Sequence, residues 1–175
     1  MDMLQPVATI QLEVYEDSEK FIGVAKVTLP EIVHPTVGIA ASGMMGGVDV
    51  PIIGMVNSMK TTLQFLDGNN PTSMVRLLSS GKHQLDLRAP NQWWNMQTVD
   101  SGLWADRYLM LGRTISFNQG EIAPFSQQNA TVQMEVYRYA AYRDGKTVFD
   151  IDKRIQKFEV NGVDYFAPVK AALGG

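Results

Sequence analysis

Two histidines and one pair of aspartates are the residues of this 175-residue chain best suited to metal binding or acid–base chemistry. His34 and His83 each stand alone, because neither has a second ligand at the spacing of a metal site. Asp150 and Asp152 flank one residue and would share a face of a strand, where a carboxylate pair can exchange a proton. Such a pair is far more often a solvated strand end, so we expect neither a metal site nor a catalytic pair.

The known catalytic and phosphate-binding motifs are missing from the sequence. The glycines from Gly43 to Gly47 are not followed by the Lys-Ser/Thr of a phosphate-binding loop, and there is no nucleophile elbow or HExxH helix. The chain has no cysteine, which excludes disulfides and thiolate ligands. The sequence therefore predicts a protein that is not an enzyme and needs no cofactor.

Composition indicates one globular unit that spans residues 1–175. Hydrophobic residues make up 45% of the chain and the mean hydropathy is −0.08. The net charge of −3 and the isoelectric point near 5.3 argue against a nucleic-acid-binding surface that needs many phosphate contacts. They do not argue against nucleic acid passing close to the protein.

Two long alternating stretches, 107–118 and 128–143, dominate the sequence. In the first, Leu109, Leu111, Ile115 and Phe117 occupy every second position, which predicts a buried face, while Tyr108, Met110, Thr114 and Ser116 point the other way. Strands of about 12 to 15 residues exceed the usual 5 to 6. Their length and polar face predict a sheet that continues into another subunit.

The remaining elements complete a mainly β fold, a β-sandwich or open barrel with one flanking helix. Asn70-Pro71 should begin that helix and Gly81 should end it, with Met74, Leu77 and Leu78 docked on the sheet. Pro168–Leu173 should form one or two short helical turns. Further strands are expected at 9–15, 21–29, 55–65, 84–89 and 147–151.

Residues 36–54 are rich in glycine and methionine and do not fit a regular strand throughout. One interpretation is a loop packed on its own domain. The other is an arm that becomes ordered against a neighbouring subunit, a role that suits the adaptable methionine side chain.

Residues 91–105 look irregular and contain all three tryptophans, Trp93, Trp94 and Trp104. They could cover one end of the core. Alternatively, Trp93 and Trp94 could form a ligand platform or an interface anchor.

Several motifs in a fixed order carry a resemblance to a known family. They are Gly23–Pro30, the Ser42–Pro51 segment, Leu111-Gly112-Arg113, Tyr139–Lys146, Ile151-Asp152 and Val160–Asp164 followed by Leu173-Gly174. In this order the chain resembles the major tail tube protein of temperate phages with contractile tails, a family shared with phage-tail-like bacteriocins. The resemblance covers most of the chain, although the segment with the tryptophans departs from the family pattern.

The resemblance implies an assembly. Hexameric rings would close one inner β-barrel from the long strands of six subunits, and the rings would stack into a tube inside a sheath. Its partners would be other copies of the chain, the sheath protein, baseplate and terminator proteins at the tube ends, and DNA or a tape-measure protein in the lumen. The location would be the virion tail, after assembly in the host cytoplasm. A bacteriocin or injection-particle tube is the first alternative, and a soluble β-barrel binding module using Trp93 and Trp94 is a distant one.

Two sets of residues would carry this function. The polar strand faces should line the lumen, with Ser58, Lys60, Thr62 and Gln64; Thr114, Ser116 and Asn118; and Thr131, Gln133 and Glu135. One lysine and one glutamate offset each other there, so that DNA would slide without being gripped. Contacts between subunits or rings are expected from Ser42, Gly43, Met44, Met45, Gly46, Gly47, Val48, Asp49, Tyr165 and Phe166. A β-bulge near Gly112 would exchange the strand faces.

Overall fold

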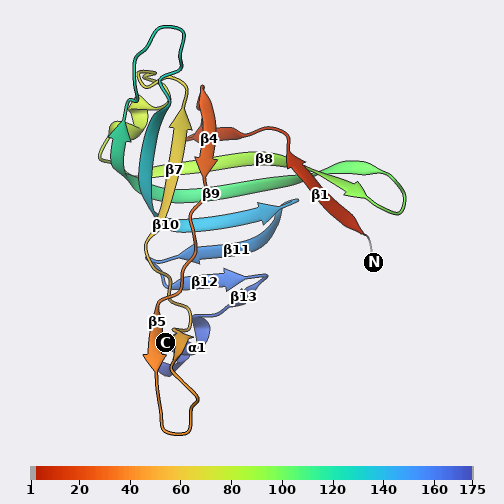
Figure 1. Ribbon diagram of the computed structural model, residues 1–175, viewed down its shortest axis with the longest axis vertical. Coiled ribbons are helices and arrows are strands. Elements are labelled where there is room, and N and C mark those ends of the chain that lie inside the picture. Colours follow the sequence, from red (N-terminus) through yellow and green to blue (C-terminus); the bar gives the residue numbers. More distant parts are fainter. Residues whose placement is uncertain (1–2, 175) are drawn as a thin grey trace.

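The computed structural model describes residues 3–174 and is built almost entirely of antiparallel strands (Figure 1). The strands are β1 Leu4–Thr9, β2 Glu13–Glu16, β3 Glu19–Lys20, β4 Val24–Thr28, β5 Thr36–Ile39, β6 Val48–Pro51, β7 Met59–Phe65, β8 His83–Asn95, β9 Ser101–Asn118, β10 Ala130–Arg143, β11 Lys146–Asp152, β12 Lys157–Val160 and β13 Val163–Asp164. A 3-10 helix, η1, spans Val75–Leu78, and one α-helix, α1, spans Ala167–Ala172. The predicted mainly β class is confirmed. Within the described range, no helix is long and apolar enough to cross a membrane.

One large sheet folds over on itself into two layers that share β9 and β10. The first half of β10 pairs with β7, which pairs with β4, while the last part of β9 lies on the other side of β10. We call β4, β7, residues 130–136 and residues 113–118 the four-stranded layer. The second half of β10 pairs instead with β11, and the first part of β9 pairs with β8, which adds β2. We call these strands the second layer.

The core lies between the two layers, as the alternation of side chains dictates. Met59, Leu63 and Phe65 on β7 are almost fully buried, whereas Lys60 and Thr62 between them turn outward. The inner faces of β8, β10 and the segment around η1 complete one continuous cluster that includes Leu85, Leu87, Val132, Met134, Val136, Met74 and Leu77.

The pairing of β9 with β10 contains two β-bulges, and because of them the faces of β9 differ from the prediction. The register skips Ile115 on β9 and Tyr137 on β10. An extra residue reverses the alternation beyond it. Met110 is therefore 1% exposed and Ile115 is 51% exposed, the opposite of the prediction. Phe117, beyond the bulge, still packs on the core as expected.

The predicted helix over 70–81 is mostly wrong. Only the four residues of η1 are helical, and Leu78 is 56% exposed rather than docked. Met74 and Leu77 are buried, and their spacing of three matches a 3-10 turn, in which residues i and i+3 align. The expected turns at the C-terminal end are present as α1.

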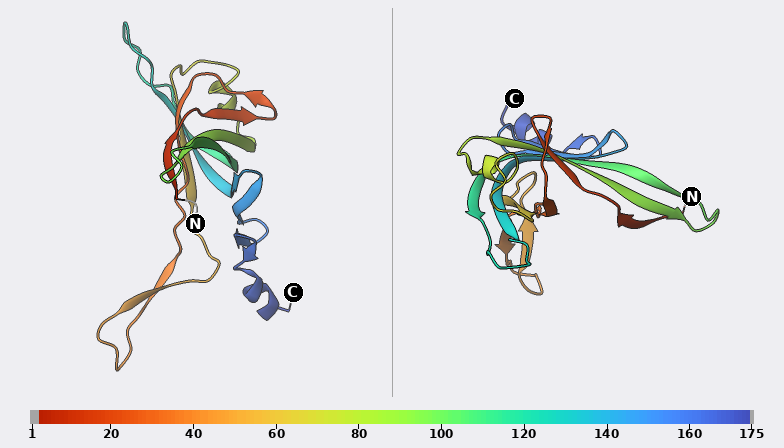
Figure 2. Two further views of the ribbon diagram at one scale, coloured as in Figure 1. Left: turned by 90° about the vertical axis from the view of Figure 1, so that its right-hand side faces the viewer. Right: turned by 90° about the horizontal axis from the view of Figure 1, so that it is seen from above.

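Residues 91–105 are regular, contrary to expectation. They continue β8 and β9 as a hairpin that extends sideways from the body, and β1 pairs with its β8 strand (Figures 1 and 2). We call β1 with residues 90–105 the ribbon.

Residues 36–54 also form a projection. Strands β5 and β6 pair only with each other among the described residues, and their hairpin extends away from the body on the side where α1 lies (Figures 1 and 2). We call this hairpin the arm.

Candidate assembly surfaces

The outward face of the four-stranded layer carries rows of polar side chains set by the strand register. Cross-strand partners form the rows Lys60–Glu135–Arg113, Thr62–Gln133–Ser116 and Gln64–Thr131–Asn118. On the neighbouring strand β4, Lys26 pairs with Gln64 and Thr28 pairs with Thr62, which lengthens two of the rows. The layer is thus apolar toward the core and polar on its other side.

One residue of the predicted lining does not belong to this face. The Thr114 hydroxyl donates a hydrogen bond to the Leu77 carbonyl, 2.5 Å away, and so points toward η1 and the core. The bulge at Ile115 is the cause, because it separates the facing of Thr114 from that of Ser116. Arg113 takes the place of Thr114 on the polar face.

Sequence reasoning also missed Lys26 and Thr28. Their strand β4 ends at Thr28, two residues before Pro30, and the alternation of Lys26 and Thr28 with Val27 was a usable signal. Ser58 behaves as predicted in facing outward, since its hydroxyl donates a hydrogen bond to Glu135 Oε2 at 2.6 Å.

Both edges of the four-stranded layer are open. Strand β4 pairs with β7 on one side, and residues 113–118 of β9 pair with β10 on one side, because β8 stops pairing at Gly112. Within residues 3–174 the second side of each edge has no strand partner. An open edge presents unpaired backbone groups, so it can pair with a strand of another chain.

The arm has one apolar face that nothing in the described chain covers. Val37 lies opposite Val50 and Ile39 lies opposite Val48, and all four side chains are 44–53% exposed. The opposite face carries Gly38 and Asp49. Of the predicted contact residues, Val48 and Asp49 lie on β6, and Ser42, Gly43, Met44, Met45, Gly46 and Gly47 form the tip, where Met45 is fully exposed.

The two predicted C-terminal contact residues differ in placement. Tyr165 is 50% exposed, whereas Phe166 is 8% exposed and belongs to the chain's own core. Phe166 packs on Gly54, where a Cβ would come within 2.6 Å of the ring. Tyr165, Ile52, Ile53 and Val160 instead line an open apolar groove of about 430 Å³ at the root of the arm.

The tryptophans do not form a joint platform. Trp93 and Trp94 are consecutive on β8 and therefore point to opposite faces of the ribbon. Trp93 lies over Gly102, its cross-strand partner, and the Arg143 guanidinium lies 4.4 Å from the centre of the Trp104 ring. Only Trp94, at 38%, is substantially exposed.

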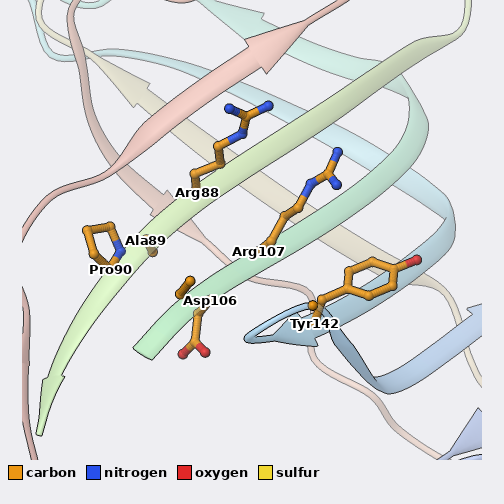
Figure 3. Close-up of a pocket in the computed structure, with 8 residues that line it drawn as sticks. Arg88, Ala89, Pro90, Asp106, Arg107 and Tyr142 are labelled. Carbon is orange, nitrogen blue, oxygen red and sulfur yellow. The ribbon is translucent and has the colours of Figure 1, made fainter. Parts of the chain in front are cut away.

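A depression of about 410 Å³ lies where the ribbon joins the second layer (Figure 3). Arg88 and Arg107 extend on one side of the two strands, and both bind the carboxylate of Asp86. Asp106 points to the other side, where Arg143 forms two hydrogen bonds with it and lowers its pKa. Each of these carboxylates is held by at least one arginine, so neither is poised to act as an acid or base.

Asp150 and Asp152 share a face as predicted, but they are buried rather than solvated. Burial alone would raise the pKa of each carboxyl, yet hydrogen bonds outweigh it and hold both pKa values below the ordinary range. The donors are Arg138 and Lys157 for Asp150, and Arg154 for Asp152. Both carboxylates are therefore ionised at neutral pH, and Asp150 links β11 to Arg138 on β10 and Lys157 on β12.

The two histidines also have structural partners. His83 is buried and its Nδ1 lies 2.6 Å from Glu16, which Arg76 also contacts. His34 Nδ1 lies 2.9 Å from the Met55 carbonyl oxygen. Among residues 3–174 no group of side chains has the composition of a metal site.

Comparisons with known proteins identify relatives of this architecture. The family model described as phage tail tube protein FII matches residues 8–174. Two solved structures from the extracellular contractile injection system PVC are similar. The sheath/tube terminator has a TM-score of 0.57 and 14% identity over 79% of this chain and 97% of that one. A chain of the sheath-tube complex has a TM-score of 0.55 and 15% identity over 78% and 91%. At 14–15% identity, these two matches show only that the chain has a similar fold. No curated protein matches the chain.

Proposed function

The chain belongs to the phage tail tube protein FII family and is a structural subunit of a tail tube, and we propose that six copies form a ring whose inner wall is one continuous β-barrel. The observation that carries this proposal is the four-stranded layer, which is open at both edges, polar on one face and apolar on the other. A layer of this kind is complete only when a barrel removes its edges.

The strand directions suit such a ring. Successive strands of the layer are antiparallel, and their number is even, so β9 and β4 run in opposite directions. Rotation about the tube axis preserves direction along that axis. The β9 edge of one copy can therefore pair with the β4 edge of the next as a regular antiparallel ladder.

In this ring the polar rows line the lumen, and the second layer faces outward. The proposed lining keeps nine residues of the predicted set, Ser58, Lys60, Thr62, Gln64, Ser116, Asn118, Thr131, Gln133 and Glu135, and adds Arg113, Lys26 and Thr28. A hydrophilic wall keeps the channel filled with water, and DNA or a tape-measure protein passes through it. Thr114 is excluded because it faces the core.

The arm supplies the contact between neighbouring subunits or rings. An isolated two-stranded hairpin is marginally stable in water, and its exposed valine and isoleucine face needs a surface to cover it. A head-to-tail contact of this kind repeats into a stack. Tyr165 and the groove beside it lie at the arm's root and are proposed to take part.

The sheath surrounds the tube in this proposal, and baseplate and terminator proteins close its ends. The finished tube is part of the virion tail after assembly in the host cytoplasm. A tube that carries no genome is the second candidate, since both solved structures reported above come from an injection system. Neighbouring capsid and portal genes would separate the two.

Electron microscopy of the purified protein, combined with thiol labelling, tests the proposal. The chain has no cysteine, so single cysteines can be placed at Thr62, Ser116 and Gln133, and at Leu63, Thr114 and Val132. We expect hollow tubes in which a small reagent labels the first three and spares the second three. A stable monomer, or the reverse labelling pattern, would reject the barrel.

A further inference from the structure

The polar face of the four-stranded layer has an excess of positive charge. Its ionisable side chains on the paired strands are Lys26, Lys60 and Arg113 against Glu135, a net charge of +2, whereas the whole chain has −3. The bulge at Ile115 produces part of this excess, because it places Arg113 on the same face as Lys60. The balance of one lysine and one glutamate expected from the sequence is therefore wrong for this face.

These three cations also form no ion pair within the subunit. Across residues 3–174 no ion pair involves Lys26, Lys60 or Arg113, and Glu135 accepts a hydrogen bond from the Ser58 hydroxyl. The second layer differs, because Arg107, Arg138 and Arg143 each bind a carboxylate there. Cations are thus neutralised on one layer and left free on the other.

Acidic residues lie in the connections beyond the ends of this face. Asp67 follows β7 and Glu121 follows β9, both at the end of the layer marked by Phe65 and Asn118. Glu31 follows β4 at the other end. The basic character belongs to the middle of the wall rather than to its rims.

Resting on the proposed function, we infer that this wall binds the phosphate backbone of duplex DNA, without sequence preference and in a salt-dependent manner. Lysine, arginine, hydroxyl and amide side chains are the groups that contact phosphates, and apart from Glu135 they make up the rows of this face. No row contains an aromatic residue, which single-stranded nucleic acid needs for stacking and a protein partner uses as an anchor.

The binding is expected to restrain DNA without stopping it. Each cation that contacts a phosphate adds a counterion-release contribution that weakens as salt rises. Because every phosphate is equivalent to the next, the contacts can be exchanged along the duplex, as in proteins that slide on DNA. The wall would hold DNA at low ionic strength and release it at high ionic strength.

Sedimentation of assembled tubes with a fluorescent duplex of about 20 bp tests this inference between about 50 and 200 mM salt. The test variant is K60Q/R113Q. The matched control is K82Q/K146Q, which removes the same charge from two exposed lysines outside the four-stranded layer. We expect the wild type and the control to retain DNA with the same steep salt dependence. The test variant should bind at least about tenfold more weakly at the lowest salt, with a salt slope smaller by about 1 or more.

The possible results separate this inference from the proposed function. Labelled cysteines at Thr62 and Gln133 together with equal DNA retention by test variant and control would overturn the inference and leave the tube intact. Tighter retention of polyglutamate than of DNA of equal charge would overturn the assignment to nucleic acid in favour of an acidic polypeptide. Absence of tubes would reject the proposed function itself.

Discussion

Trp93 lies over Gly102 so closely that a Cβ on this glycine would come within 2.4 Å of the indole ring. The two residues are cross-strand partners in the ribbon, which has no core of its own beneath it. The ring covers the backbone where the glycine lacks a side chain. This pair and the Arg143–Trp104 contact add side-chain packing to the strand pairing of the projecting ribbon.

The first prediction concerns this pair. G102A should destabilise the protein by about 1–3 kcal/mol, because the new methyl group displaces the indole. Urea unfolding and near-ultraviolet circular dichroism would measure the change. G81A is the control, since a Cβ there meets nothing closer than 3.9 Å. In W93A/G102A the obstructing ring is gone, so the two effects should not add. Additive effects would show that the ring and the glycine act independently.

The second prediction concerns the ion pair of Asp106 with Arg143. The pKa of Asp106 is lowered in the folded state, so its contribution to stability is present above the ordinary aspartate pKa and is lost as pH falls through the lowered value. D106N should cost about 1–3 kcal/mol at pH 7. The difference in unfolding free energy between D106N and wild type should shrink as pH falls below about 4.

Urea unfolding of D106N and wild type, measured over a range of pH, would test whether the charge of Asp106 stabilises the fold. D100N is the control, because Asp100 is exposed and lies in the ribbon's connecting loop. A D106N deficit that stays constant down to acid pH would show that packing, not charge, is responsible.

The third prediction concerns the arm. V37S/V50S replaces one directly opposed pair of valines on its apolar face with polar serines. The variant should fail to form tubes, while the unfolding free energy of the rest of the subunit stays unchanged. D49N, on the other face of the same hairpin, should still form tubes. Hydrogen exchange should be fast across residues 36–54 in the monomer and slow in the tube. Equal protection in both states would mean that the arm has no partner.

The fourth prediction separates Tyr165 from Phe166. Phe166 is buried against Gly54, so F166A should cost about 3–5 kcal/mol of folding stability. Y165S should leave folding within about 0.5 kcal/mol of wild type, because the side chain is half exposed, and should instead shorten the tubes. Thermal unfolding and electron microscopy report the two effects separately. Tubes of normal length from Y165S would show that Tyr165 does not contribute to the contact between subunits or rings.

The sequence predicted β2, β4 and β7 to β11 because each has a clear period of two, and β7 with the first half of β10 was also assigned to the correct faces. It did not predict β1, β3, β5, β6, β12 or β13 as strands. It failed on the faces of β9, because the bulge lies at Ile115 rather than at Gly112, where the glycine had suggested one. It failed for residues 91–105 because Gly102 and two asparagines weaken local strand propensity, which pairing with β1 and packing by Trp93 override.

The outward polar face of the four-stranded layer was mostly predictable because it follows alternation, and the exceptions on β9 trace to the same bulge. Thr114 left the face and Arg113 joined it. Phe166 could not be distinguished from Tyr165 by type or spacing, since only the close approach of Gly54 decides which of the two is buried.

Strands β9 and β10 each pass from one layer into the other without interruption, β9 after Gly112 and β10 at the bulge at Tyr137. In the proposed barrel, any axial force on the channel wall would therefore be carried to the exterior along covalent peptide bonds. In a sandwich with separate sheets the same load would be carried across a side-chain interface, which slips far more easily than a backbone stretches. A tube built from such subunits would move as a stiff rod, with its lining unable to lag behind its outer surface when it is driven through a barrier.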